Sequence, residues 1–489
     1  MSDPGQVAAA QQAYERLVGV PAADVDEFPI HGLDRLGVPV WTAMTFRGGP
    51  SRGGLGYGAT PEIARLSAWG EFAESVQPRR TLRAREPRIA SHAELRREGA
   101  PAVDPLSLCL PVATDYAPDR RLRWVEASYH PDGEPVLVPL DFVVQDTAEI
   151  PDLDGLITPI TNGLGAGETR ERAICHAVLE LLQRDGNSVS YRALDRGIAI
   201  DPDEVADPDL RETLERFDRE GVEVVPKLAA TDFGMANVYV VGFDRDPARS
   251  PHPLSLGACG EAVHPGREVA LAKALREFAA ARSRKAFFHG PLSLAAPLVP
   301  EGYLDRYRAL DLAREEPRAF AEMRAWAAMP PAAFLDTIRD PVLTVRRRVP
   351  LSSLPTTPAT DPSAVLALLT ERLAGEGLRI VVVDFTTPGD PASVVKAIVP
   401  GLEVETMSYA RVGPRNLRRL LERGADFAGR GEPPAGAYRV PMRAEDEDAL
   451  AGPHWFSPEG AKRALRGLYP LYREPSRHSV AVANERAGR

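Results

Sequence analysis

The length and composition of the chain indicate a folded protein of more than one domain. Its 489 residues exceed the roughly 100–200 of an ordinary domain, and a content of 44% hydrophobic and 26% charged residues excludes a disordered chain, which could not bury so large a core. A net charge of −10 argues against a general nucleic-acid binder, and no apolar run reaches the ~18 residues of a membrane-spanning helix.

The order of helix and strand signals predicts a mixed α/β fold. Thr60 followed by Pro61 is typical of a helix start and predicts roughly four turns, to about Val76, and Thr169 begins a second, Ala- and Leu-rich helix. Strands predicted over residues 124–128 and 136–143 flank the turn sequence His-Pro-Asp-Gly and form a hairpin. Other predicted strands cover residues 222–228, 238–243 and 378–384, and other predicted helices cover 267–283 and 361–376.

The remaining segments suggest how the chain divides. The Pro-rich, charged stretch 298–355 has the weakest pattern, with one helical piece over 315–328, so we predict an insertion or linker subdomain rather than core. Residues from Arg473 onward lack periodicity and are predicted to form a mobile tail. The predicted parts are an N-terminal extension (1–29), a core in two pieces (30–297 and 361–472), the insertion (298–360) and the tail (473–489).

Carboxylates recur on the small-residue faces of three of these helices. Glu71 and Glu74 are three residues apart on the first, Glu180 and Gln183 repeat the spacing on the second, and Glu277 is the only charge on this face of the third. Mg²⁺ prefers oxygen ligands, usually one or two carboxylates with phosphates and water, so the pattern predicts a metal and triphosphate site; ordinary solvated glutamates are the alternative. The small residues of these faces, predicted to leave room for a ligand, are Ala64, Ala68, Ala173, Ala177, Ala270, Ala274 and Ala281.

Glycine-rich segments lead into the first two helices. Flexible backbone N–H groups at a helix N-terminus favour anions. Neither segment contains the Gly-Lys-Ser/Thr of a phosphate loop, whereas the G-x-G-x-G spacing of residues 163–167 leaves a dinucleotide-binding oxidoreductase as an alternative. The glycines before the first helix are Gly48, Gly49, Gly53, Gly54, Gly56 and Gly58, and Asn-Gly-Leu-Gly-Ala-Gly (162–167) precedes the second.

Other chemistries lack their motifs. No Gly-x-Ser-x-Gly or His-Glu-x-x-His occurs, so no motif supports a serine hydrolase or a metalloprotease. Cys175 and His176 are adjacent on a helix and point about 100° apart, so they cannot pair as nucleophile and base. The chain's three cysteines, which also include Cys109 and Cys259, are too dispersed to predict a disulfide framework or a zinc site.

These segments resemble, in order, the ATP-site motifs of the YcaO family. Residues 58–75 resemble its first motif, residues 162–185 its second, which ends in Glu-x-x-Glu/Gln-Arg-Asp, and residues 274–282 its third. The family's N-terminal motif is similar to residues 33–40, and its late strand and Pro-Gly-Leu-Glu segment are similar to residues 383–386 and 399–403. Because the matches span about residues 30–415, the chain is identified as a divergent member of that family.

The resemblance implies a fold and an activity. The implied fold is the α/β YcaO-type ATP-binding fold of mixed sheets and packed helices. The implied enzyme uses ATP and Mg²⁺ to modify a backbone amide of a ribosomally made peptide, as a cyclodehydratase or thioamide synthetase. Azolines, thioamides and amidines are the products known in the family.

The resemblance also assigns residues, although no catalytic side chain. A guanidinium suits phosphate because its fork donates bidentately. Metal and arginine together would offset charge in phosphoryl transfer. By resemblance, Mg²⁺ is ligated by Glu71, Glu74, Glu180 and Glu277, and the nucleotide is contacted by Ser67, Asn162, Gln183, Arg184 and Arg282.

The partners follow from the same resemblance. The YcaO-like pattern begins by about Leu33 with no separate leader-binding domain before it, so a leader-binding or TfuA-like partner is expected to present the precursor peptide or protein, and a homodimer is expected. The first residues lack the basic and apolar regions of a signal peptide, which predicts a cytoplasmic location. Neither nucleic acid nor membrane is an expected partner.

Three departures from the family pattern bear on the expected activity, and the first two favour an alternative. Tyr57 stands where the family usually has a lysine between two glycines, and Ala280 and Ala281 replace a common Gln-Ser before Arg282. The last residues lack the Pro-rich ending of many azoline-forming members, which argues against a standard azoline-forming enzyme. The alternative is a catalytically impaired YcaO-like scaffold that binds a peptide or a partner enzyme.

Overall fold

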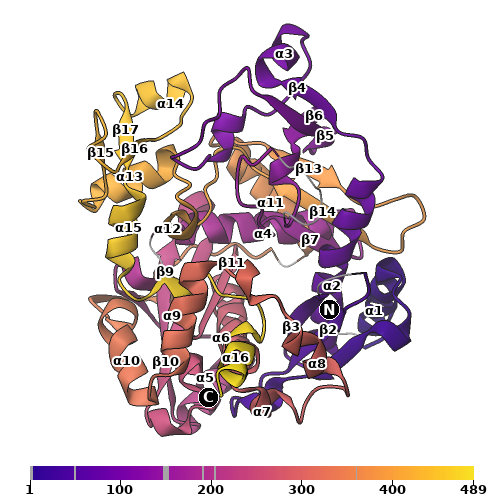
Figure 1. Ribbon diagram of the computed structural model, residues 1–489, viewed down its shortest axis with the longest axis vertical. Helices are drawn as coiled ribbons and strands as arrows, with labels where there is room; N and C mark the ends of the chain where they lie inside the picture. The colour runs from indigo at the N-terminus through magenta and orange to yellow at the C-terminus, as the bar shows by residue number, and fades with distance from the viewer. Residues whose placement is uncertain are drawn as a thin grey trace. The chain divides into compact units, whose positions relative to one another are not determined.

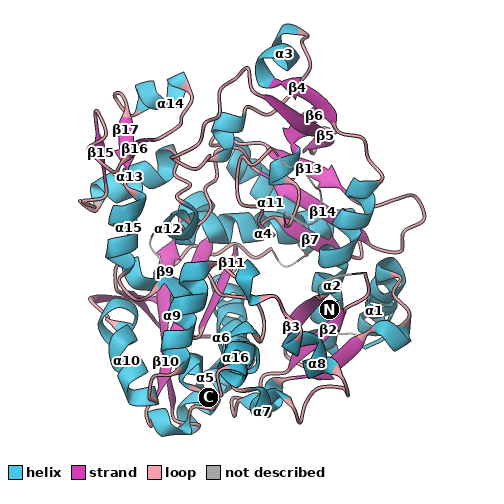
Figure 2. Ribbon diagram, viewed as in Figure 1, coloured by secondary structure: helices cyan, strands magenta, loops and turns pink. Residues whose placement is uncertain are grey.

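The computed structural model describes residues 4–48, 51–146, 154–189, 192–202, 205–359 and 361–488. These residues form several sheets with packed helices, the mixed α/β class predicted from the sequence (Figures 1 and 2). The chain divides into two compact units: unit 1 comprises residues 1–72, 190–358 and 466–489, and unit 2 comprises residues 73–189 and 359–465. Each unit therefore combines segments that are distant in sequence.

Unit 1 contains two sheets. The first has three antiparallel strands in the order β1-β2-β3. The second has the order β11-β10-β9-β8-β12, antiparallel throughout except that β12 runs parallel to β8. The predicted strands 222–228 and 238–243 are β9 and β10. The strands of unit 1 are β1 (Asp26–Pro29), β2 (Val40–Thr45), β3 (Arg52–Tyr57), β8 (Ile198–Asp201), β9 (Val222–Ala230), β10 (Ala236–Asp244), β11 (Cys259–His264) and β12 (Arg347–Pro350).

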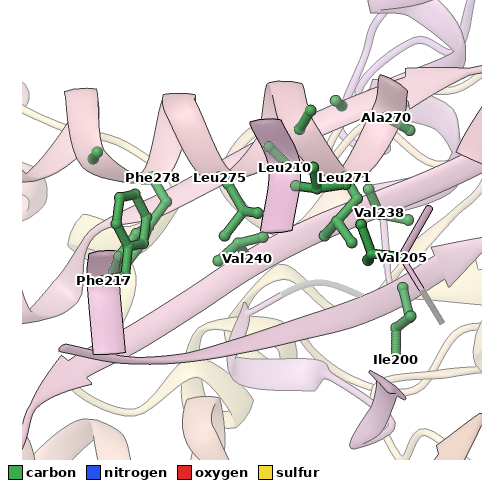
Figure 3. Close-up of a cluster of buried hydrophobic side chains, with 14 of the residues drawn as sticks. Ile200, Val205, Leu210, Phe217, Val238, Val240, Ala270, Leu271, Leu275 and Phe278 are labelled. Carbon is green, nitrogen blue, oxygen red and sulfur yellow. The ribbon is translucent and has the colours of Figure 1, made fainter. Parts of the chain in front are cut away.

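The helix α6 (Arg267–His289) forms much of the core of unit 1. It begins where the sequence predicts and packs on β10 and β11. Figure 3 shows Leu271, Leu275 and Phe278 of α6 facing Val238 and Val240 of β10, all fully buried. The other helices that lie wholly in unit 1 are α1 (Pro4–Val18), α5 (Pro208–Arg219), α7 (Leu292–Ala295), α8 (Tyr303–Arg308), α9 (Pro317–Ala327), α10 (Pro331–Ile338) and α16 (Ser479–Arg486).

The stretch predicted as an insertion or linker outside the core contributes core instead. Trp326 of α9 is 2% exposed and Phe334 of α10 is fully buried, in a cluster with residues of β9 and β10. β12 extends the five-stranded sheet. The prolines that weakened the helical pattern stand at helix starts, where Pro317 and Pro331 fit without loss of a hydrogen bond.

The predicted mobile tail is packed as well. Val480 and Val482 of α16 are buried. Ahead of them, the Glu474 carboxylate lies 2.7 Å from Arg284 Nη1 and 2.9 Å from Lys285 Nζ. Burial alone would raise the pKa of Glu474, but these two cations hold it well below its usual value. The prediction was wrong because the ion pairs depend on partners nearly 190 positions away on α6, which periodicity does not reveal.

Unit 2 contains a six-stranded and a three-stranded sheet. The first has the order β4-β5-β13-β14-β7, with β6 also paired to β5 in the predicted hairpin. Residues 140–142, predicted as strand, form a 3₁₀ turn. The second sheet has the order β15-β17-β16. The strands are β4 (Arg88–Ser91), β5 (Arg121–His130), β6 (Pro135–Pro139), β7 (Leu164–Gly167), β13 (Ile380–Asp384), β14 (Ser393–Ile398), β15 (Ala428–Arg430), β16 (Tyr438–Arg439) and β17 (His454–Phe456).

Helices cover the large sheet of unit 2. α4 packs on β7 and β14, and α11 packs on α4. The helix start predicted at Thr169 is capped, because the Thr169 side chain accepts the Arg172 N–H. The structure also shows a cap at Asp361, whose side chain accepts the N–H groups of Ser363 and Ala364. The helices are α3 (His92–Arg97), α4 (Arg170–Asn187), α11 (Pro362–Ala374), α12 (Thr406–Tyr409), α13 (Pro414–Glu422), α14 (Ala444–Ala449) and α15 (Pro458–Leu465).

The helix α2 (Pro61–Arg83) begins as predicted and runs past the predicted end near Val76. Gln77 Nε2 and Thr81 Oγ1 of this extension both donate to the Phe385 carbonyl, at 3.0 and 3.1 Å. The additional turns are thus held by tertiary hydrogen bonds rather than by helix propensity. Among the described residues, no helix combines the length and the apolar character needed to span a bilayer.

Candidate functional site

Three strand–turn–helix segments carry the predicted carboxylates. β3 leads into α2, β7 into α4 and β11 into α6, each through a connection of two or three residues. The carboxylates Glu71, Glu180 and Glu277 each lie ten residues after the first residue of their helix. Three positions further on stand Glu74, Gln183 and Ala280. The copies are about a hundred residues apart, well beyond the 20–50-residue periods of ordinary sequence repeats.

The alanine faces of these helices lie directly against glycines of the preceding strands. A Cβ on Gly56 of β3 would meet Ala68 N at 2.1 Å, one on Gly165 of β7 would meet the Ala173 carbonyl at 2.2 Å, and one on Gly260 of β11 would meet the Ala274 carbonyl at 2.0 Å. The small residues therefore permit close helix-to-strand packing. The expectation that they leave room for a ligand was wrong. Of the glycines named above, Gly49 lies outside the described residues.

Replacing Gly260 with alanine is expected to destabilise unit 1 by about 1–3 kcal/mol, because the new methyl group would push α6 away from β11. Gly467→Ala is the matched control, since a Cβ there meets nothing within 4 Å. Urea unfolding of both variants measures the difference. Equal midpoints for the two variants would show that the strand and helix can separate without cost.

In unit 1, β3 holds both glutamates. The Leu55 N–H donates to Glu71 Oε2 at 2.8 Å, and the Tyr57 hydroxyl donates to Glu277 Oε2 at 3.2 Å. Burial and the nearby Glu277 raise the pKa of Tyr57 well above its usual value, so Tyr57 remains a hydrogen-bond donor. The residue that departs from the family lysine thus contacts one of the predicted metal ligands.

In unit 2, β7 and the residue before it hold the other two glutamates. The Ala166 N–H donates to Glu74 Oε1 at 2.7 Å, and the Gly163 N–H donates to Glu180 Oε2 at 2.9 Å. Gly163 has a φ of +85°, a conformation that glycine adopts without strain. Each glycine-rich strand therefore orients a pair of carboxylates through hydrogen bonds to a carboxylate oxygen.

The residues predicted to contact nucleotide differ in accessibility. Ser67 on α2 is exposed, whereas Asn162, Gln183 and Arg184 are half-buried. Arg184 Nη2 lies 3.7 Å from Glu180 Oε1, one helical turn away. Their contact with nucleotide stays a prediction.

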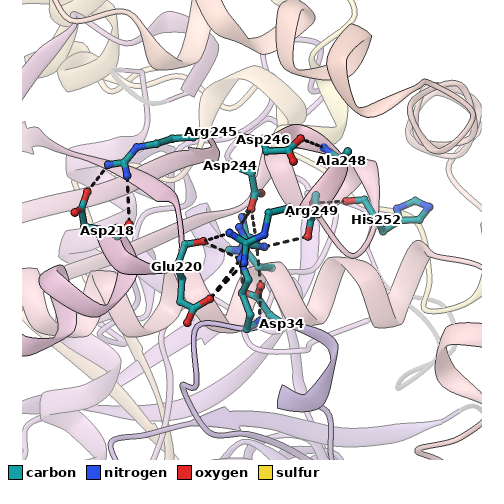
Figure 4. A network of polar contacts seen from close by, with 12 residues as sticks. Asp34, Asp218, Glu220, Asp244, Arg245, Asp246, Ala248, Arg249 and His252 are labelled. Carbon is teal, nitrogen blue, oxygen red and sulfur yellow. Dashed lines mark hydrogen bonds and ion pairs between the residues drawn. The ribbon is translucent and has the colours of Figure 1, made fainter.

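Arg282 occupies a different environment from the one predicted. It is fully buried, its Nε lies 2.7 Å from Asp34 Oδ2, and its Nη1 lies 2.9 Å from Asp244 Oδ2. Arg35 also pairs with Asp244, and its Nε donates to the Glu220 carbonyl at 3.0 Å. Figure 4 shows Asp34 and Asp244 in this network. These ion pairs anchor α6 five residues beyond Glu277, and a nucleotide contact of Arg282 stays a prediction.

His264, at the end of β11, makes the stability of the folded protein depend on pH. Its Nδ1 accepts the Gly266 N–H at 2.9 Å, and burial lowers its pKa to about 4. Below pH 6.5 His264 becomes protonated in the unfolded chain, whereas in the folded chain it stays mostly neutral down to about pH 4. The free energy of unfolding therefore decreases as the pH falls below 6.5, by about 2 kcal/mol at pH 5. His264→Asn keeps an acceptor without the titration, and its unfolding free energy is expected to fall less between pH 7 and 5. Parallel pH profiles in denaturant unfolding would contradict this assignment.

The predicted ligands suit Mg²⁺ chemically. All four are carboxylates, the hard oxygen donors that Mg²⁺ prefers. In the described ranges no group of three or more His, Cys, Asp or Glu side chains could hold a metal ion. One or two carboxylates suffice for Mg²⁺ when phosphates and water complete its coordination. The residues therefore fit a metal that binds together with a nucleotide.

Two known proteins are similar to the chain over more than half of its length. An uncharacterized protein of Methanothermobacter thermautotrophicus is 29% identical over 390 residues, 78% of this chain and 90% of the relative. A protein described as an uncharacterized protein in the tfuA 3′ region of Rhizobium leguminosarum bv. trifolii is 28% identical over 276 residues, 54% of this chain and 57% of the relative.

Solved structures share the fold. YcaO from Methanopyrus kandleri, bound with AMPPCP and Mg²⁺, matches with a TM-score of 0.57 and 22% identity over 84% of this chain and 93% of its own. A heterocyclase in complex with substrate and cofactor matches with a TM-score of 0.58 and 16% identity over 81% of this chain, which spans about half (52%) of the heterocyclase.

A family model decides the assignment. The model described as YcaO cyclodehydratase, ATP- and Mg²⁺-binding, matches residues 55–403, most of the chain. This range begins within β3, contains the other two strand–turn–helix segments in full, and includes every predicted ligand. The chain belongs to the YcaO family, with its mixed α/β fold and with ATP and Mg²⁺ as its cofactors.

Proposed function

We propose that this protein uses ATP and Mg²⁺ to modify a backbone amide of a ribosomally made peptide or protein. A nucleophile adds to the amide carbonyl, the resulting oxyanion takes the γ-phosphoryl group of ATP, and phosphate then leaves as the carbonyl carbon re-forms a double bond. Family membership supports this reaction class. The observation that carries it is the paired support of four carboxylates by two glycine-rich strands.

In this proposal the glutamates bind the metal and other side chains bind the nucleotide. Glu71, Glu74, Glu180 and Glu277 bind Mg²⁺, which would neutralise charge on the phosphates. The carboxylates are oriented before the ligand binds by hydrogen bonds from Leu55, Tyr57, Gly163 and Ala166. Binding therefore costs little side-chain conformational entropy. Ser67, Asn162, Gln183 and Arg184 bind the nucleotide.

Thioamide formation is the outcome that we favour within the class. External sulfide would be the nucleophile, and a TfuA-like protein would be the partner that presents the substrate. The similarity to a protein in a tfuA 3′ region supports both parts of this choice. A homodimer and a cytoplasmic location stay predictions.

The test combines the purified protein with a candidate precursor peptide, a TfuA-like partner, sulfide, ATP and Mg²⁺. Mass spectrometry is expected to show exchange of one amide oxygen for sulfur that depends on ATP. An ATP-dependent loss of water without sulfide would instead identify an azoline. No ATP-dependent mass change with any partner would refute the enzyme.

The impaired scaffold is the second candidate, and Tyr57 favours it. The Tyr57 hydroxyl contacts Glu277. The lysine that usually stands at this position in the family would instead face phosphate. Calorimetry with ATP and Mg²⁺ separates the two candidates. Retained partner binding without nucleotide binding would favour the scaffold.

A further inference from the structure

A pocket in unit 2 lies between the end of β14 and the loop before β7. Its empty space, with the open solvent at its mouth included, is about 510 Å³. Most of its wall is apolar, with Ile157, Ile160 and Leu181 among the lining residues. A ligand would therefore need an apolar body.

Arg411 gives this pocket a cation with an unused donor. It is 4% exposed, its Nε donates to the Cys109 carbonyl at 2.7 Å, and its Nη2 donates to the Leu108 carbonyl at 2.8 Å. Its buried Nη1 has no hydrogen-bond partner among the described residues. A buried donor of this kind costs free energy until an acceptor reaches it.

The other charged groups of the wall leave positive charge in excess. Lys396 is 2% exposed, and its Nζ donates to the Ile160 carbonyl at 2.6 Å. Glu403 accepts the Gly413 N–H at 2.8 Å and the Arg415 N–H at 2.7 Å. Burial and the neighbouring Asp185 raise the pKa of Glu403 to about 7, so near neutral pH it carries only part of a negative charge. The wall therefore favours an anion.

We propose that this pocket binds an apolar ligand that carries one carboxylate group, with Arg411 as the residue that recognises the carboxylate. A carboxylate carries one charge on two oxygens, whereas a phosphate presents three strong acceptors and up to two charges. One unpaired guanidinium nitrogen matches the smaller group. A free aliphatic acid and the C-terminal residue of a peptide both have this chemistry.

The test uses four probes on the unmodified protein without ATP. 4-Methylpentanoate and acetyl-Gly-Gly-Leu supply the carboxylate as a free acid and as a peptide terminus, and their amides are the matched neutral probes. Calorimetry is expected to show at least one acid binding about tenfold or more tightly than its amide. Which acid binds better identifies the source. Acids that bind no more tightly than their amides, or no binding at all, would overturn the proposal.

Arg411→Gln tests the assigned residue, and Arg379→Gln is its control because Arg379 is in the same unit, exposed, and outside the pocket lining. The acid is expected to lose its advantage over the amide in Arg411→Gln and to keep it in Arg379→Gln. Unchanged discrimination in a folded Arg411→Gln would overturn the assignment. If that variant fails to fold, the acid and amide comparison on the unmodified protein decides. Since no probe requires ATP, failure here leaves the proposed amide chemistry standing.

Discussion

Replacing Glu180 or Glu277 with glutamine is expected to weaken binding of Mg²⁺-ATP by roughly 100-fold or more. Even residues that only support a metal ligand cost 10–100-fold when changed, so loss of a ligand should exceed that range. Glutamine keeps the size of the side chain and one acceptor for the Gly163 N–H or the Tyr57 hydroxyl. The loss would therefore report charge at the metal rather than collapse of the strand–helix contact.

Glu171→Gln is the control for this experiment. Glu171 is an exposed carboxylate in the first turn of α4, the helix that carries Glu180. Calorimetry with ATP and Mg²⁺ is expected to give an unchanged dissociation constant for this variant. If all three variants bind nucleotide like the unmodified protein, the glutamates are not its metal ligands. Lost binding in all three would indicate a general charge effect on α4 and α6.

Asp244→Asn is expected to lower the free energy of unfolding of unit 1 by about 3 kcal/mol or more. Asp244 is fully buried and pairs with both Arg282 and Arg35, so its neutralisation leaves the buried Arg282 paired with Asp34, and Arg35 paired with Glu220. Breaking one side of a buried ion pair typically costs ~3–5 kcal/mol. Urea unfolding followed by intrinsic fluorescence would measure the change.

Asp218→Asn is the matched comparison, and Figure 4 shows both carboxylates. Asp218 pairs with Arg245 on the surface, where the two side chains are 67% and 50% exposed. Solvent screens such a pair, so the expected loss is much smaller than for Asp244→Asn. Similar losses for the two variants would show that the buried network around Arg282 contributes no more than a surface pair.

Local signals in the sequence were sufficient to predict the helix starts and the positions of the glutamates on their helices. Thr60 and Thr169 cap their helices as predicted, because an N-cap acts on N–H groups two or three residues away. The spacing of Glu71 and Glu74 likewise depends only on helix geometry. Such features are complete within a few residues of chain.

Features that depend on distant partners could not be predicted in the same way. Helical periodicity gives α6 an alanine face but does not show that Gly260 lies against it. It places Arg282 after Glu277 but does not show Asp34 and Asp244 around its guanidinium. The packed C-terminal segment depends equally on Glu474 meeting α6. In each case the sequence shows the residue but not the distant residue that it contacts in the fold.

The division of the chain into interleaved segments constrains the order in which it can fold during synthesis. Residues 466–488 complete unit 1, which also contains the first residues of the chain. N-terminal domains usually fold first as they leave the ribosome. Here β1 and β2 share a buried cluster with Ala481 and Val482 of α16, which are made late, while unit 2 has all its residues once 465 is made. The later unit in sequence can thus be the earlier one to fold, and the N-terminal segment spends most of synthesis without its final partners.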